Sequence, residues 1–210
     1  MTNALANGFY DVPAGKVAAI VTHLEMRGRV PERVGPRPEG LTFRKIDQPD
    51  LHTYRDLYAR VGGIAWLWFS RLQMADEALE AIISDPDCPL YTLEVDGRPE
   101  AMLELDFRIE GECELAFFGL APALIGRGAG RYLMNQAIRL AWDRPITRFH
   151  VHTCTLDSPD ALPFYIRSGF RPIRQQIEIT DDPRITGTLP PEAGPHVPVF
   201  EARGSKSSPK

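Results

Sequence analysis

The sequence has few cysteines and lacks any paired cysteine motif. Three cysteines occur in 210 residues, Cys88, Cys113 and Cys154, and no two of them have C-x-x-C spacing. An odd number of thiols cannot form a fully paired disulfide framework within one chain. We therefore expect free thiols and a reducing compartment.

Excess positive charge and long apolar runs are also lacking. The formal net charge is −4, and lysine and arginine are scattered apart from a short basic end at Ser205–Lys210, so nothing favours a nucleic-acid partner. The most apolar stretch, Val61–Phe69, is far too short to cross a membrane. Met1–Asp11 lacks the basic region and apolar run of a signal peptide. We expect a cytoplasmic protein with no membrane partner.

The chain divides into an arm, one domain and a tail. Residues 1–40 are expected to form an N-terminal arm with one candidate extra strand at Lys16–Leu24, because the prolines and glycines after it prevent long regular elements. Residues 41–202 are expected to form a single compact domain, and residues 203–210 a disordered tail.

Within the domain, the periodicity changes from helical to alternating and back. Asp47 or Asp50 is positioned to cap a first helix that Gly62-Gly63 would stop, and Ser158 to cap a late helix that Gly169 closes. Three antiparallel strands form a meander with an Asp96-Gly97 hairpin turn. The order is typical of an α+β fold with a mixed sheet. The expected strands are 41–46, 90–95, 101–109, 113–120, 147–153 and 175–180, and the other expected helices are 75–83 and 128–142.

A glycine loop joins the third meander strand to the following helix. Gly126, Gly128 and Gly130 leave backbone N–H groups free at a helix N-terminus, where the helix dipole favours an anion. Arg127 and Arg131 flank this turn and can contribute to binding a diphosphate. The loop lacks the Gly-Lys-Ser/Thr of a Walker motif, and its G-x-G-x-G spacing follows a meander rather than an early βαβ unit. For a lone glycine triplet, a turn without ligand would be the simpler interpretation.

Two motifs resemble the GNAT superfamily of acetyltransferases. Ile125–Gly130 is similar to the family's Gln/Arg-x-x-Gly-x-Gly/Ala phosphate loop except at its first position, where Ile125 replaces a polar residue. Phe164–Phe170 resembles the family's Tyr-x-x-x-Gly-Phe signature. Ser158 lies seven residues before Tyr165, where many members carry an asparagine that contacts the cofactor.

This resemblance implies a GNAT fold, with helices on both faces of a twisted mixed sheet, and acetyl-CoA as co-substrate without a metal. The pantetheine arm would pair with the backbone at the end of the third meander strand, and the pyrophosphate would lie on the glycine loop, with Ser158 close to the cofactor. The implied cofactor-binding residues are Phe118, Gly119, Leu120, Gly126, Arg127, Gly128, Ala129, Gly130, Arg131 and Ser158.

The resemblance also suggests an acid–base pair. Glu114 occupies the strand position of the base in histone-type members, and apolar neighbours would raise its pKa; the alternative is a solvated strand glutamate. Glu104 and Asp106 are reserve bases that would act through water. Tyr165 is the expected acid, because its phenol stays protonated until a thiolate forms; the alternative is core packing.

Other residues suggest further sites. His150, His152 and Cys154 alternate on one strand in a spacing that metals use, yet no fourth ligand is evident, so a packed strand face is the expectation. Trp66, Trp68 and Phe69, with Arg71, fall where family members build the acceptor pocket, which suggests an apolar or aromatic acceptor, although core packing also explains them. Cys113 and Cys154 are expected to be buried thiols rather than nucleophiles.

The expected function is direct transfer of an acetyl group from acetyl-CoA to a primary amine, most simply a small molecule. One alternative is an acyl-CoA-binding or sensing module on the same fold, without catalysis. Another, from a different class, is a nucleotide-binding protein that uses the glycine turn. The sequence leaves open the acceptor, the acyl chain length and the oligomeric state, including a homodimer.

Overall fold

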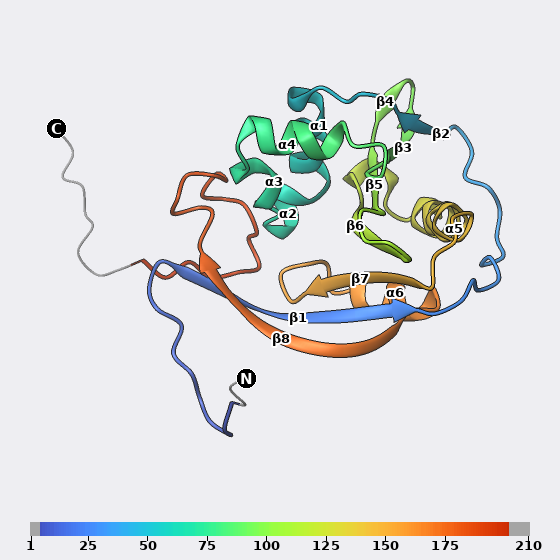
Figure 1. Cartoon of the computed structure of the whole chain (residues 1–210). Helices are drawn as coiled ribbons and strands as arrows, with labels where there is room; N and C mark the ends of the chain where they lie inside the picture. The colour runs from blue at the N-terminus through green and yellow to red at the C-terminus, as the bar shows by residue number, and fades with distance from the viewer. Residues whose placement is uncertain (1–4, 202–210) are drawn as a thin grey trace.

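A single eight-stranded mixed sheet organises the molecule. The computed structural model describes residues 5–201. Neighbouring strands follow the order β2-β3-β5-β6-β7-β1-β8, and a short β4 pairs with β3 outside this path (Figure 1). The strands are β1 (Lys16–Met26), β2 (Thr42–Ile46), β3 (Leu90–Val95), β4 (Arg98–Pro99), β5 (Ala101–Asp106), β6 (Glu112–Leu120), β7 (Arg148–Cys154) and β8 (Arg171–Asp181).

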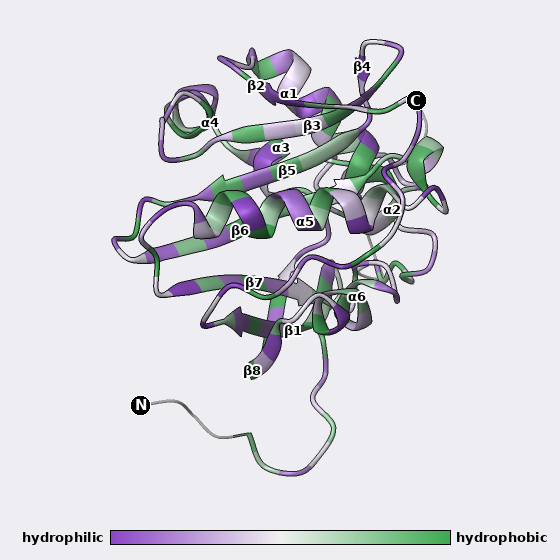
Figure 2. Cartoon of the chain, turned by 90° about the vertical axis from the view of Figure 1, so that its right-hand side faces the viewer, coloured by the Kyte–Doolittle hydropathy of each residue, from purple (hydrophilic) through white to green (hydrophobic). Residues whose placement is uncertain are grey.

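Helices cover both faces of the sheet, and the buried apolar side chains of residues 5–201 form three cores. One core joins the sheet to α5 and α6, and a second joins it to α1 and α4. A third joins β1 to Leu67 and to the segment after β8. Figure 2 shows α5 lying across one face, in front of β5 and β6. This is the mixed-sheet α+β fold expected from the sequence. The helical segments are α1 (Leu51–Tyr58), π-helical η1 (Ala59–Gly63), α2 (Ile64–Trp66), α3 (Ser70–Gln73), α4 (Asp76–Ile83), 3₁₀-helical η2 (Pro122–Leu124), α5 (Ala129–Trp142) and α6 (Ala161–Arg167).

None of the helices within residues 5–201 is long and apolar enough to span a lipid bilayer.

The antiparallel meander forms as predicted, because its turns have the required chemistry. Asp96 and Gly97 both have positive φ, 50° and 79°, as a tight two-residue hairpin requires. β3, β5 and β6 then pair in sequence, and a register shift after Glu104 places an extra residue in β6. This bulge changes the face to which the end of β6 directs its side chains.

The first helix does not stop at Gly62-Gly63, so that prediction is wrong. Asp50 caps α1 by accepting from the Thr53 amide at 2.9 Å, as expected, but the chain continues through η1 and α2. A Cβ atom at Gly62 would lie 1.9 Å from the Trp68 ring. The glycine therefore permits close packing of an aromatic ring rather than ending the helix.

The late helix begins later than the predicted cap at Ser158. The residue that precedes α6 is Asp160, and the Ser158 hydroxyl instead accepts from the Asp160 amide at 3.3 Å, in a turn ahead of the helix. Pro159 fits this turn, because its fixed φ suits the residues just before or at a helix start.

The extra strand expected in the arm exists, and it is an interior strand of the sheet, between β7 and the edge strand β8. β1 pairs antiparallel with β7 on one side and with β8 along nearly its whole length on the other. Figure 1 shows β1 and β8 as two long strands lying side by side. β1 is therefore part of the same sheet as the strands of residues 41–201 and not a separable addition to them. The β-branched pattern revealed the strand but not its partners. The expected tail at 203–210 lies outside the described residues.

β6 and β7 are paired over a short distance only. Their parallel pairing runs from Glu112 opposite Arg148 to Glu114 opposite His150. Beyond that point β6 continues to Leu120 and β7 to Cys154 without pairing to each other. The two halves of the sheet therefore separate, and the edge of β6 that faces β7 is left without a strand neighbour.

The chain after β8 folds back onto α2 and is held by a buried ion pair. Asp182 and Arg184 lie 2.7 Å apart, with side chains 1% and 3% exposed. The Arg184 guanidinium also donates to the carbonyls of Ala193, Gly194 and Val197. One arginine thus holds three points of a segment that has no helix or strand of its own.

We predict that Arg184→Ala lowers the free energy of unfolding by about 3–5 kcal/mol, because it leaves the buried Asp182 carboxylate uncompensated. Urea denaturation followed by circular dichroism measures the change. The matched control is Lys45→Ala, whose ion pair with Asp47 is exposed and whose loss should cost less than about 1 kcal/mol. Equal effects of the two substitutions would contradict the structural role of Arg184.

Candidate active site

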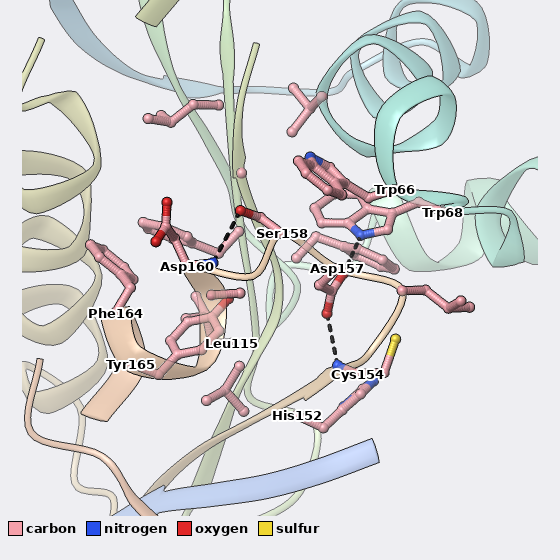
Figure 3. A pocket seen from close by; sticks show the side chains of 18 of the residues that line it. Trp66, Trp68, Leu115, His152, Cys154, Asp157, Ser158, Asp160, Phe164 and Tyr165 are labelled. Atoms are coloured by element: carbon pink, nitrogen blue, oxygen red, sulfur yellow. Dashed lines mark hydrogen bonds between the residues drawn. The ribbon is translucent and has the colours of Figure 1, made fainter. Parts of the chain in front are cut away.

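A cleft of about 730 Å³ opens where β6 and β7 separate. Its lining comes from the ends of both strands, from α2 and the residues after it, from the loop after β7, and from α6. Figure 3 shows the aromatic side chains of Trp66 and Trp68 on one side and those of Phe164 and Tyr165 on the other. The cleft therefore has two walls that come from different layers of the fold.

The glycine loop lies at the α5 end of this cleft. Gly126 and Gly128 have φ values of 78° and 75°, in the left-handed region that favours glycine. The Tyr132 amide makes a helical bond to the Gly128 carbonyl, so the amides of the preceding residues form the free first turn of α5. A Cβ atom at Gly126 would have no neighbouring heavy atom within 4 Å, so the space above the loop is open. The loop thus has the backbone geometry of an anion site.

The two arginines of the loop bind the N-terminal arm. Arg131 donates to the carbonyls of Arg33 and Pro36, and Arg127 donates to the Glu39 carbonyl at 3.2 Å. Their guanidinium groups therefore tie residues 33–39 to the glycine loop, a contact that the sequence did not indicate. A direct contribution of these side chains to phosphate binding stays a prediction.

The end of β6 presents an unpaired backbone edge to the cleft. Phe118, Gly119 and Leu120 pair with β5 on one side and line the cleft on the other. An extended ligand can form strand-like hydrogen bonds along such an edge. The three residues predicted to hold a cofactor arm are thus brought together with Gly130 of the loop and with Ser158, both of which also line the cleft.

Tyr165 lies in the α6 wall and lines the cleft, while its role as the acid stays a prediction. Its side chain is 7% exposed and packs edge-on against the rings of Phe118, Phe164 and Phe170. Burial, with a smaller contribution from the charge of Asp157, raises the pKa of the Tyr165 phenol. The phenol therefore stays protonated through the neutral range and is a donor for any strong base formed in the cleft.

Glu114 does not have the raised pKa expected from an apolar setting. Its carboxylate lies 3.3 Å from Nδ1 of His152, and this contact lowers the pKa of Glu114 despite partial burial. Glu114 sits beside the cleft rather than in its lining, which begins on β6 at Leu115. The sequence could not show this, because the contact joins two strands that are far apart along the chain.

His152 connects Glu114 to the cleft. It lines the cleft with about half of its side chain exposed, and the contact with Glu114 raises its pKa. A carboxylate on Nδ1 fixes the imidazole tautomer and leaves Nε2 for another partner. The ring also lies near His23 of β1, with centroids 5.8 Å apart. The sequence interpretation treated His152 only as part of a packed strand face.

Glu104 and Asp106, the reserve bases, each form an ion pair with an arginine. Glu104 is 2% exposed, pairs with Arg71 at 2.6 Å and accepts from the Tyr54 hydroxyl at 2.5 Å. Asp106 pairs with Arg108, which lowers the pKa of Asp106 against the effect of burial. Neither carboxylate lines the cleft, so neither is placed to act there.

Asp157 is a cleft residue that the sequence interpretation missed. Its Oδ1 accepts from Nε1 of Trp68 at 2.9 Å, and its Oδ2 accepts from the Thr153 hydroxyl at 2.7 Å and the Cys154 amide at 2.9 Å (Figure 3). The only available signal was its position directly before the Ser158-Pro159 turn, which reads as ordinary cap chemistry. Trp66, Trp68 and Phe69 do line the cleft, as proposed for the acceptor wall.

The thiols and histidines form no metal cluster in the described part of the chain. Within residues 5–201, no group of three or more His, Cys, Asp or Glu side chains has a metal-binding arrangement. Burial raises the pKa of Cys154 to about 11 and also raises that of Cys113, so both thiols stay protonated near neutral pH. Whether the protein works without a metal stays a prediction.

Comparisons with known proteins identify the family of this chain. A model of the acetyltransferase (GNAT) family matches residues 51–170, more than half of the chain. Curated proteins give no match. A GCN5-related N-acetyltransferase from Sphaerobacter thermophilus aligns with a TM-score of 0.60 and 15% identity, over 88% of this chain and 54% of that one. A GCN5-related N-acetyltransferase from Kribbella flavida aligns with a TM-score of 0.53 and 19% identity, over 82% of this chain and 63% of that one.

This chain thus spans about half the length of the Sphaerobacter protein. Identities of this size establish a common fold rather than a common substrate. The family match covers both the glycine loop and the helix of Tyr165, and residues of both line the cleft. The chain belongs to the GNAT family of acetyltransferases.

Proposed function

We propose that this protein transfers an acetyl group from acetyl-CoA to a primary amine of a small molecule in the cytoplasm, directly between the two bound substrates. The observation that carries the proposal is the open edge of β6, which leads from the glycine loop into a cleft containing Tyr165 and His152. Acyl transfer to an amine needs a base for the amine and an acid for the departing thiolate, and this cleft offers one of each.

The residues present fit acetyl-CoA in three places. The amides of the first turn of α5 suit the pyrophosphate. The unpaired edge at Phe118, Gly119 and Leu120 suits the amide groups of a pantetheine arm. Ser158, in the cleft beside them, offers a hydroxyl, although it already accepts from the Asp160 amide. When bound, acetyl-CoA supplies the thioester whose carbonyl carbon the amine attacks.

The protein's own groups then move two protons. Nε2 of His152 accepts a proton from the amine, so that the nitrogen lone pair becomes available. Backbone N–H groups at the end of β6 donate to the carbonyl oxygen as negative charge develops there. The Tyr165 hydroxyl would give its proton to the departing thiolate sulfur, and the tyrosinate would regain a proton from the acylated nitrogen, which still has a second proton to lose, directly or through water.

Glu114 has a supporting role in this proposal. It contacts Nδ1 of His152 and therefore holds the imidazole with Nε2 directed away from β6. Because the pKa of Glu114 is lowered, it stays charged at every pH at which His152 titrates. The amine proton thus reaches the Glu114–His152 pair through the imidazole, rather than passing to Glu114 directly.

We predict that Gly128→Asp weakens acetyl-CoA binding by at least about tenfold, because a carboxylate then stands at the proposed pyrophosphate position. Isothermal titration calorimetry measures the affinity. Gly97→Asp is the matched control, since Gly97 has a similar φ of 79° in a hairpin turn outside the cleft. Unchanged affinity in a folded Gly128→Asp variant would remove the glycine loop from the cofactor site.

We predict that His152→Gln lowers kcat by about 100-fold to 10,000-fold, as loss of a general base does. The exposed His52 on α1 provides the control substitution His52→Gln, which should leave kcat unchanged. A decrease below about threefold for His152→Gln would show that bulk water accepts the proton.

The pH profile separates the roles of Glu114 and His152. Because the carboxylate raises the pKa of His152, we expect the rising limb of kcat/KM in the native protein to lie above the ordinary histidine pKa. We predict that Glu114→Gln moves this limb to lower pH, since the neutral base then persists in more acidic solution, while kcat falls. If Glu114 were itself the base, that limb would disappear and high pH would partly restore activity.

We predict that Tyr165→Phe preserves acetyl-CoA affinity while kcat falls by about 100-fold or more, because the ring still packs but the proton donor is gone. Tyr91→Phe on β3, which lies outside the cleft, is the control and should retain full activity. Loss of acetyl-CoA binding in Tyr165→Phe would identify Tyr165 as a binding residue instead of the acid.

A further inference from the structure

The wall of the cleft opposite Tyr165 is built around one tryptophan in a fixed position. A Cβ atom at Gly62 would lie 1.9 Å from the ring of Trp68, and one at Gly119 would lie 3.1 Å from it. Two glycines, one from η1 and one from β6, thus let this ring lie directly on the backbone of both layers. The ring cannot shift toward either layer.

An uncommon backbone conformation supports this wall. Leu67, between Trp66 and Trp68, has φ 55° and ψ 36°, in the left-handed region that branched residues rarely adopt. Its side chain is 2% exposed and packs against Gly194, where a Cβ atom would lie 2.4 Å from Leu67. The segment held by Arg184 therefore locks the reversal at Leu67. Strain of this kind persists only where the surroundings enforce it, and it concentrates at functional sites.

The fixed tryptophan orients a carboxylate into the cleft. Asp157 receives three donors, from Trp68, Thr153 and the backbone of Cys154. A carboxylate has about four acceptor positions, so a further N–H donor can still be accepted. Because Asp157 also lines the cleft, that remaining position is available to a ligand beside two indole rings.

The charges around the cleft favour a cation and disfavour an anion. Asp157, Asp160 and Glu178 line it, whereas Arg167 is the only lysine or arginine among the described lining residues. A cationic amine next to aromatic faces gains from both the carboxylate and the ring quadrupoles. An acceptor that carries its own carboxylate would meet like charge in this cleft.

The volume of the cleft limits the size of the acceptor. The same cleft of about 730 Å³ has to hold the end of the cofactor arm as well as the acceptor. His196 covers Trp66 from the C-terminal segment, with ring centroids 5.3 Å apart, and its Nε2 contacts the Leu156 carbonyl at 3.1 Å. The acceptor end is therefore suited to a compact body rather than to a polymer chain.

We propose that the acceptor is an arylalkylamine, a primary amine on a flat aromatic body without a carboxylate, whose amine donates to Asp157 while its ring lies against Trp66 and Trp68. This inference rests on the proposed acetyl transfer and names the substrate class of that same cleft. Asp157 acts here as a binding residue that holds the nitrogen, and the proton still leaves through His152.

The direct test compares matched acceptors. Tryptamine and phenethylamine differ from tryptophan and phenylalanine by the carboxylate alone. We expect kcat/KM for each arylalkylamine to exceed that for its amino acid by about 100-fold or more. The acidic side chains that line the cleft would repel the added carboxylate of the amino acid. Spermidine, which has amines but no ring, should also be a poor acceptor. Equal or greater activity with the amino acids, or with spermidine, would overturn the inference while leaving acetyl transfer intact.

Two variants test the named residues. Asp157→Asn should raise KM for tryptamine about tenfold or more with an unchanged Kd for acetyl-CoA, because an amide is a weaker acceptor than a carboxylate. Trp66→Leu should raise the same KM without disturbing the bonds of Asp157. Asp143→Asn and Trp142→Phe, on α5 outside the cleft, are the matched controls. Unchanged KM in both cleft variants would exclude this wall as the acceptor site.

A binding measurement distinguishes failure of the proposed acceptor site from failure of the proposed acetyl transfer. Calorimetry with tryptamine and with tryptophan reports the acceptor site without turnover. Tight tryptamine binding that Trp66→Leu weakens, with no release of CoA from acetyl-CoA, would refute the enzymatic function and retain the site. Release of CoA with amines that do not compete with tryptamine would retain the function and refute the site.

Discussion

The parting of β6 from β7 is the constraint on which the rest of the structure depends. The strands share only three paired positions, ending at Glu114 opposite His150. Past that point one strand edge is free to pair with a ligand, and the space between the strands becomes the cleft. The bulge in β6 and the strand β1, which occupies the far side of β7, let the two halves of the sheet stay ordered after they separate. A fully paired sheet would have no such space.

The two walls of the cleft differ in which parts of the chain hold them in place. The α6 wall follows from local sequence, because Tyr165 sits on a short helix closed by Gly169 and packs among Phe118, Phe164 and Phe170. The opposite wall depends on distant segments: two glycines beneath Trp68, the reversal at Leu67, and the C-terminal segment around Arg184. The proposed catalytic groups and the proposed acceptor wall thus reach one cleft by different routes, in keeping with a common fold that carries varied sites.

The difference between local features and contacts between distant segments explains which features the sequence could reveal. The meander, the turn at the glycine loop and the position of Tyr165 on a short helix were predictable because turn chemistry and motif spacing are local. The Glu114–His152 contact was not, because it depends on the register between strands that are separated along the chain. Gly62 was misread as a helix stop because a glycine that admits a ring and one that ends a helix look identical in sequence. Asp157 was missed because nothing in its local pattern indicates that Trp68, 89 residues away along the chain, donates to it.

The central claim is that acetyl-CoA binds along the open edge of β6 and the first turn of α5. Amide hydrogen exchange by NMR, with and without acetyl-CoA, tests it most directly. We predict slowed exchange at the end of β6 between Phe118 and Leu120 and at the amides of residues 128–131, with little change in the hairpin at Gly97. Saturating acetyl-CoA that leaves those amides unprotected, or that protects a different surface, would contradict it.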